Sequence, residues 1–209
     1  MPGPVKVTRE QLISSAETLF AARGLDGVSL NEITKAAGQR NASALNYHFG
    51  GKDGVLEAIL EKHQPVIDDE RQRMLEKLEP IEDASLRQLV EVLVLPLVAK
   101  MDDPDGGTEY VRVMAQLIGS PSHSFLDQGT GGMHAGGTRL MRAISKRLAN
   151  LSRPELRMRT LLVVSLLFHG LSDFVRLNEA GIVNATQRDR LVTSLLDGLV
   201  GILSAKETK

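Results

Sequence analysis

The chain has 209 residues, of which 42% are hydrophobic and only 3% aromatic, and it contains no cysteine. This length fits one ordinary domain, or a small domain joined to a mid-sized one, and the apolar content excludes a disordered chain. The absence of cysteine excludes disulfides and thiolate metal sites. A formal net charge of −1 excludes a general coat for nucleic acid, so any binding to DNA must depend on a few well-placed groups.

The first regular pattern covers residues 8–23 and predicts an amphipathic helix. Thr8 and Gln11 have the spacing of a capping box, and Gly24 is placed to end the helix. One face of the helix is apolar and consists of Leu12, Ala16, Leu19 and Phe20. This periodicity is typical of a helix that packs on one side only.

Residues 29–49 predict two further short helices joined by a glycine turn. Ser29 and Glu32 form a second capping box, which begins the first of these helices. The second helix is capped by Asn41 or Ser43 and is expected to run for about two turns. A long helix follows almost at once, so three short helices form a small N-terminal head.

The second of these short helices has an apolar and a polar side. Its apolar side chains, Leu45 and Phe49, are expected to pack inward against Val28, Ile33 and Ala36. The outward side chains are Arg40, Ser43, Ala44, Asn46 and Tyr47. Arg and Asn can hydrogen-bond base edges in a DNA groove, and small residues allow a helix to approach closely.

Three neighbouring groups complete the predicted DNA-contacting set. Tyr47 and His48 can reach phosphate oxygens, and Lys52 can hold a phosphate together with the backbone amides of its helical turn. Ser29, at the start of the preceding helix, is included in the set. The layout of a capped helix, a glycine turn, a polar short helix and a basic hinge predicts a helix-turn-helix.

The remaining chain predicts helices throughout, with no alternating pattern long enough for a strand. The expected helices cover residues 52–78, 84–101, 108–119, 138–150, 154–180 and 186–205. Pro65 and Pro96 are expected to bend the first two of them. The segment 120–137 is rich in Ser and Gly and is either a mobile lid or a loop insertion. The predicted fold class is therefore all-α, with about nine helices.

The last two predicted helices are expected to join two copies of the chain. Residues 161–175 are apolar on nearly all sides, so this helix should be buried on more than one face. The final helix carries two apolar ridges, formed by Leu191, Leu195 and Leu199 and by Val192, Leu196, Val200 and Leu203. A homodimer through a four-helix contact is predicted, and the alternative is that both helices only close the core of a monomer.

The sequence contains no complete motif for phosphate binding, metal binding or catalysis. The glycines at 129–132 lack the preceding strand and the following Gly-Lys of a phosphate-binding loop. No two histidines have the spacing of a helical metal site, and no catalytic constellation stands out, so we expect no metal, no cofactor and no enzymatic activity. The longest apolar run, 161–171, is shorter than the roughly 20 residues that span a bilayer, and residues 1–7 form no secretory signal. We therefore expect a cytoplasmic protein.

Residues 8–60 resemble the head of the TetR (tetracycline repressor-like) family of transcriptional regulators. That family has an Ala-Gly turn, a short recognition helix ending in Leu-Tyr-x-His-Phe, and a Lys three residues later. The matching positions here are Ala37-Gly38, Leu45-Asn46-Tyr47-His48-Phe49 and Lys52. The first helix is similar to the family pattern A-x-x-L-F-x-x-x-G through Ala16, Leu19, Phe20 and Gly24.

The sequence departs from the family pattern in two places. The turn after Gly38 is one residue longer than the common spacing, and Asn46 stands where the family has Tyr, with Tyr47 next to it. Either Tyr47 or Asn46 therefore makes the phosphate contact of the family's tyrosine. Because of the longer turn, an interaction protein that dimerises without contacting DNA stays open as an alternative.

The resemblance implies a helix-turn-helix DNA-binding domain over residues 1–52 and a helical ligand-binding and dimerisation domain over residues 53–209. It implies a repressor that a small apolar effector releases from a palindromic operator in double-stranded DNA, with no membrane contact. The implied effector pocket has an apolar wall formed by Leu95, Met101, Tyr110, Met114, Leu117 and Phe168. The alternative from another class is an all-helical small-molecule carrier or enzyme that does not bind DNA.

Overall fold

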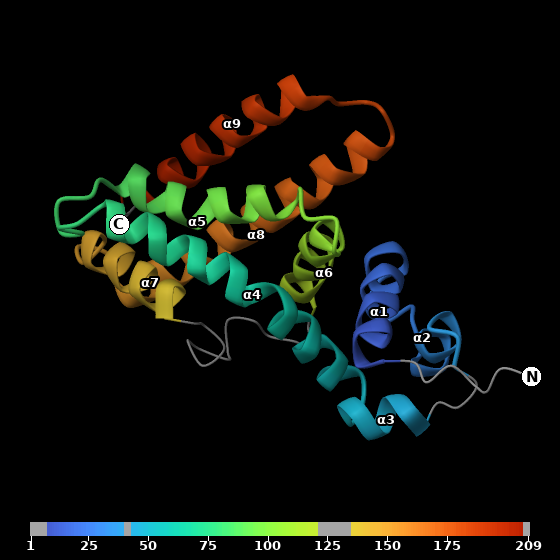
Figure 1. The fold of residues 1–209 in the computed structure, drawn as a ribbon. Helices are drawn as coiled ribbons and strands as arrows, with labels where there is room; N and C mark the ends of the chain where they lie inside the picture. Colours follow the sequence, from blue (N-terminus) through green and yellow to red (C-terminus); the bar gives the residue numbers. More distant parts are fainter. Residues whose placement is uncertain (1–7, 40–42, 121–134, 207–209) are drawn as a thin grey trace, which may run out of the picture.

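The computed structural model describes residues 8–39, 43–120 and 135–206, and these fold into nine helices without a strand (Figure 1). The helices are α1 (Arg9–Arg23), α2 (Leu30–Ala36), α3 (Ser43–Phe49), α4 (Lys52–Lys77), α5 (Leu86–Lys100), α6 (Gly107–Gly119), α7 (Ala135–Arg147), α8 (Arg153–Glu179) and α9 (Ala185–Ser204). The prediction of an all-α fold is confirmed. Most of the Ser- and Gly-rich segment 120–137 lies outside the described residues.

Short-range hydrogen bonds determine where several helices begin. At the start of α1, Thr8 Oγ1 accepts from the Gln11 amide at 3.3 Å, and Gln11 Oε1 accepts from the Thr8 amide at 2.9 Å. The same reciprocal pair, Ser29 with Glu32, begins α2. Both capping boxes were predicted and are confirmed, and reciprocal pairs that were not predicted begin α5 and α9. These caps satisfy amide groups that have no partner within the helix.

The head is a small bundle of α1, α2 and α3 built around large apolar side chains. Phe20, Ile33 and Leu45 are each 0% exposed. The expected inward position of Ala36 is wrong, because it is exposed at the end of the short α2. Phe49, at the end of α3, is half-buried rather than fully enclosed.

The long helix α4 connects the head to the body (Figure 1). Its first half packs on α1 and α3, and its second half packs on α5 and α7. The helix is continuous through Pro65, whose side chain is exposed. A single helix that contacts both units can carry a displacement from one to the other.

The body consists of α5 to α9, with α8 packed between α6 and α9, and α9 packed on α5. The buried Arg159 of α8 reaches the end of α9, where it donates to the carbonyl oxygens of Leu203 at 3.0 Å and Ala205 at 2.6 Å. The apolar ridges of α9 are mostly used inside the chain, with Leu195, Leu196, Leu199 and Leu203 at most 7% exposed.

Among the described helices, α8 is long and apolar enough to cross a membrane by length and composition. The expectation that the apolar run is too short considered only its uninterrupted part, whereas the whole helix has 27 residues. Core helices pass the same test, and α8 packs on α6 and α9 through Val163, Leu167 and Leu171. Only 33% of its apolar stretch is buried, so core packing accounts for one side of α8 and not for the exposed Met158, Leu162 and Leu166.

Candidate nucleic-acid interface

The outer side of α3 is polar and exposed, and its inner side is anchored. Leu45 is 0% exposed, whereas Tyr47, two residues later, is 86% exposed. Asn46 and His48 are also exposed, and the His48 ring meets the Tyr47 ring edge-on with centroids 5.4 Å apart. The short helix therefore presents an amide, a phenol and an imidazole on a surface held in place by one buried leucine.

The other predicted contact residues of the turn and of α3 are placed only in part. Ser43 and Ala44 lie in the first turn of α3, and Arg40 and Asn41 lie outside the described residues. The roles of these four residues remain predictions. The structure thus brings Asn46, Tyr47 and His48 together and tests their accessibility, but not their contact with DNA.

Ser29 is engaged within the head. Its hydroxyl donates to Glu32 Oε2 at 2.8 Å, and its backbone amide donates to the same oxygen at 2.9 Å. Arg23 adds an ion pair to Glu32 at 2.7 Å. The hydrogen bonds from Ser29, and then Arg23, lower the pKa of Glu32 to about 2. Ser29 therefore stabilises the start of α2, next to the proposed DNA surface.

Lys52 also has a partner inside the protein. Its ammonium donates to the Leu25 carbonyl oxygen at 2.8 Å and lies 6.0 Å from the centre of the Phe20 ring. These contacts tie the first turn of α4 to the connection between α1 and α2. The predicted phosphate contact of Lys52 remains a prediction, and the structure gives the residue a second role in positioning the head.

Gly54 is a position that the sequence analysis did not single out and that the packing of α3 on α4 requires. A Cβ atom at Gly54 would lie 1.8 Å from the Phe49 carbonyl oxygen, so any side chain there would displace the end of α3. Gly50 and Gly51 have φ values of 71° and 144°, in the region that favours glycine. The three glycines allow α3 to turn directly onto α4.

A buried polar cluster joins the head to the body. Glu17 of α1 is 1% exposed, and its Oε1 lies 2.5 Å from Nε2 of His63, which is 0% exposed. Its other oxygen accepts from Lys62 Nζ at 2.8 Å, and Lys62 also pairs with Asp105 at 2.8 Å. The head thus contributes one carboxylate to a cluster whose other members belong to α4 and to the turn before α6.

Helix α6 packs on α1, and two close approaches hold this contact. Gln116 donates through Nε2 to the Phe20 carbonyl oxygen at 2.9 Å. A Cβ at Gly106, where φ is 82°, would lie 2.7 Å from Glu17 Oε2, so the N-cap of α6 fits closely against this carboxylate. A shift of α6 would therefore displace α1, and with it the head.

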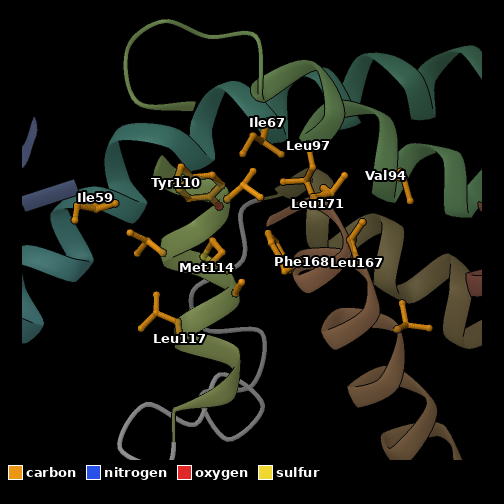
Figure 2. Packing of buried hydrophobic residues seen from close by; sticks show 14 of the residues in the cluster. Ile59, Ile67, Val94, Leu97, Tyr110, Met114, Leu117, Leu167, Phe168 and Leu171 are labelled. Atoms are coloured by element: carbon orange, nitrogen blue, oxygen red, sulfur yellow. The ribbon is translucent and has the colours of Figure 1, made fainter. Parts of the chain in front are cut away.

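The six predicted effector-lining residues fall into two groups. Tyr110, Met114, Leu117 and Phe168 are at most 7% exposed and belong to the core between α4, α6 and α8 (Figure 2). Met101 is half-buried at the C-cap of α5 and packs against the edge of the core. Leu95 is half-buried and faces the surface. The structure therefore brings four of the six together and separates two.

Leu95 lines two open grooves on either side of α5. One groove, of about 550 Å³, lies between α5 and the start of α9 and contains the ion pair of Arg188 with Asp102. The other, of about 420 Å³, lies between α4 and α5 and is lined by Met74, Val92 and other residues. Neither groove reaches the cluster around Tyr110 and Phe168.

Family comparisons agree with this architecture over both units. A family model described as "Bacterial regulatory proteins, tetR family" matches residues 12–59, and one described as "Tetracyclin repressor-like, C-terminal domain" matches residues 91–201. The first match covers α1 to α3 and the start of α4, and the second covers most of the body. The chain belongs to the TetR family of bacterial regulatory proteins.

Curated relatives are similar to the head. The chain is 40% identical over 58 residues to "HTH-type transcriptional regulator BetI" of Vibrio vulnificus (strain YJ016), covering 28% of this chain and 29% of that one. It is 38% identical over 53 residues to "Probable HTH-type transcriptional regulator YttP" of Bacillus subtilis (strain 168), covering 25% of each. The chain thus matches less than a third of the length of these relatives.

Solved structures share the fold of the whole chain. A putative TetR-family regulator from Rhodococcus sp. has a TM-score of 0.56 at 20% identity, covering 94% of this chain and 98% of that one. SmeT, the repressor of the Stenotrophomonas maltophilia multidrug efflux pump SmeDEF, has a TM-score of 0.54 at 18% identity, covering 94% and 90%. At these identities the similarity is one of fold.

Proposed function

We propose that this protein is a homodimeric repressor that binds a palindromic operator through α3 and is released by a small effector held in the body. The observation that carries the proposal is the exposure of Asn46, Tyr47 and His48 on a helix fixed by the buried Leu45. Exposed polar side chains on such a helix can enter a major groove while the buried leucine holds the helix orientation. Residue 52 is the proposed boundary between head and body, and the cytoplasm is the proposed site of action.

The dimer is proposed to form along α8. Met158, Leu162 and Leu166 are 55%, 52% and 41% exposed, and their spacing of four residues places them on one side of the helix. Gly198 of α9 lies beside this row, because a Cβ there would be 3.6 Å from Leu166. A second copy of the chain is the occupant that fits, since a palindromic operator requires two heads related by a two-fold axis.

The same contacts supply a route for release. An effector that enters between α4, α6 and α8 would displace α6, and α6 meets the head through Gln116 and at Gly106 beside Glu17. Displacement of α1 in both subunits would change the spacing of the two recognition helices. The effector must bind the released form more tightly, and a 100-fold change in operator affinity corresponds to about 2.7 kcal/mol of coupling.

DNA binding is tested by fluorescence anisotropy of the full-length protein on inverted repeats from its own promoter, over a series of salt concentrations. Tyr47→Ala is expected to weaken operator binding at least about tenfold, because the ring is exposed for a phosphate or groove contact. Ile182→Ala is the matched control, since Ile182 is 64% exposed in the turn between α8 and α9. An absence of salt-sensitive binding, or equal losses for both variants, would overturn the proposal.

Dimerisation is tested by analytical ultracentrifugation. Leu162→Glu places a charge in the middle of the exposed apolar row, and we expect it to convert dimers to monomers at micromolar concentration. Arg176→Glu, farther along the exposed side of α8 and paired with Asp173 at 3.2 Å, is the control and should leave the dimer in place. A monomeric wild-type protein would contradict the two-headed mechanism.

A further inference from the structure

Arg71 is a charged residue placed among apolar side chains of α4. Ile67 and Leu75, one helical turn before and after it, are 3% and 0% exposed. Arg71 itself is half-buried, and its Nε is shielded from solvent without a hydrogen-bond partner among the described residues. A leucine or methionine would be expected at such a position.

Two neighbouring acids on α4, Asp68 and Glu70, are already engaged elsewhere. Asp68 accepts from the backbone amides of Gly136 at 2.9 Å and Gly137 at 2.6 Å, and so caps the N-terminus of α7. Glu70 pairs with Arg73 at 2.5 Å on the outer side of the helix. Within the described part of the chain, Arg71 therefore has the long-range attraction of Asp68 but no ion pair.

The Nε–H of Arg71, buried without an acceptor, destabilises the protein unless something binds it. A buried donor without an acceptor has lost its hydrogen bonds to water and gained none in return. Burial lowers the pKa of Arg71, and the attraction of Tyr110 and Asp68 opposes this shift. Tyr110 lies next to it on α6, where burial raises the pKa of the phenol to about 12.

Arg71 thus lies at the edge of the apolar cluster in which four predicted effector-lining residues meet. Figure 2 shows Tyr110 and Met114 on α6 facing Phe168 on α8, with Ile67 of α4 close by. A ligand in this region would have an apolar surface on one side and the guanidinium of Arg71 on the other. The sequence reasoning expected few polar groups here, and it did not include Arg71.

We propose that Arg71 binds a carboxylate of the effector, whose apolar part packs against Tyr110, Met114 and Phe168. The inference rests on the proposed effector site and changes the ligand class from an apolar molecule to an amphipathic acid. A guanidinium presents two parallel N–H donors that match the two oxygens of a carboxylate. A singly charged acid also leaves the remaining surface of the ligand apolar, as the cluster requires.

The test measures binding without DNA, by isothermal titration calorimetry on the full-length protein. The probes are acid and alcohol pairs with the same carbon skeleton, 4-phenylbutyrate with 4-phenylbutanol and decanoate with 1-decanol. In the wild type we expect at least one acid to bind about tenfold or more tightly than its alcohol. Arg71→Gln should abolish this preference by weakening the acid while leaving the affinity for the alcohol unchanged.

Two further variants keep the test decisive. Arg73→Gln removes a guanidinium from the exposed side of the same helix and should retain the acid preference. Arg71→Lys keeps the charge without the two parallel N–H donors and should retain part of the acid preference. This variant also provides a test if Arg71→Gln folds poorly. The inference is overturned if no acid is preferred by the wild type, or if Arg71→Gln preserves the preference.

The calorimetry and the DNA measurement separate the two proposals. If the protein prefers acids in an Arg71-dependent way but does not bind DNA, the proposed ligand site is supported and the proposed repressor function is rejected. Salt-sensitive operator binding in a protein without acid preference would retain the repressor and reject the role of Arg71.

Discussion

The outer side of α3 and the junction between head and body place their polar groups in opposite ways. On α3, Tyr47 is 86% exposed above a leucine that is fully buried. At the junction, Glu17 and His63 are 1% and 0% exposed and face each other at 2.5 Å. The exposed groups can be exchanged without a change of fold, whereas the buried groups belong to the packing itself. Sequence preference and regulation are therefore expected to respond to mutation in different ways.

The largest effect is expected from removing the head's contribution to the junction. Glu17→Ala leaves His63 buried and Lys62 with only one of its two carboxylate partners. Removal of one partner of a buried pair costs about 3–5 kcal/mol, so we expect the free energy of unfolding to fall by that amount. Urea denaturation followed by circular dichroism measures the change.

Glu61→Ala is a matched control for this variant. Glu61 also links α4 to α1, through Arg9 at 3.3 Å, but it is 72% exposed. Exposed ion pairs contribute about 0–1 kcal/mol, so this control should have nearly wild-type stability. Equal losses for the two glutamates would show that burial of the junction does not raise its contribution to stability. The contrast with the exposed side of α3 would then have no energetic basis.

The next largest effect separates the two sides of α3. Leu45→Ala should lower the free energy of unfolding by about 2–5 kcal/mol, because it leaves a cavity at a fully buried position. Tyr47→Ala should change it by less than about 0.5 kcal/mol, because the ring is almost wholly exposed. Both should weaken operator binding, the first through the fold of the head and the second through a lost contact.

Paired measurements on each variant sharpen the distinction. In thermal unfolding and DNA anisotropy, Leu45→Ala should lower both the melting temperature and the operator affinity. Tyr47→Ala should lower the operator affinity only. A destabilised Tyr47→Ala would mean that the ring supports the head. In that case Asn46 would become the better candidate for the phosphate contact.

Features that depend on nearby residues could be predicted from the sequence. The Ser29–Glu32 capping box spans three residues, and the turn glycines and the spacing from Leu45 to Phe49 are equally local. The order of nine helices follows from the same short-range periodicity. The exposed positions of Asn46 and Tyr47 follow because a two-turn helix with one buried leucine leaves little choice of face.

Features that depend on residues far apart in the chain could not be predicted from the sequence. Glu17 and His63 are 46 positions apart, and a glutamate in the middle of an amphipathic helix is usually on its solvated side. The unpaired state of Arg71 depends on the amides of α7, which engage Asp68 from 68 positions away. The burial of most of the α9 ridges likewise depends on how α5 and α8 pack around them.

The smallest effect concerns the pH dependence of the head, where the charge of Glu32 is held by local hydrogen bonds. The folded-state pKa of Glu32 is about 2, below its ordinary value of 4.5, so the carboxylate stabilises the head above pH 4.5. This contribution should disappear as the pH falls from 4.5 towards 2. Because Glu32 is exposed, the effect should be small and should decrease with added salt.

Glu32→Gln tests this directly, since glutamine can still accept from the Ser29 amide but does not titrate. The urea midpoints of wild type and variant should differ near neutral pH and converge by about pH 2. The capping box of α1 is a built-in comparison, because Gln11 occupies the same position there and its hydrogen bond to Thr8 cannot titrate. Gln11→Ala should therefore lower stability by a similar amount at every pH. A difference between wild type and Glu32→Gln that persists at pH 2 would show that the geometry of the cap, and not its charge, stabilises α2.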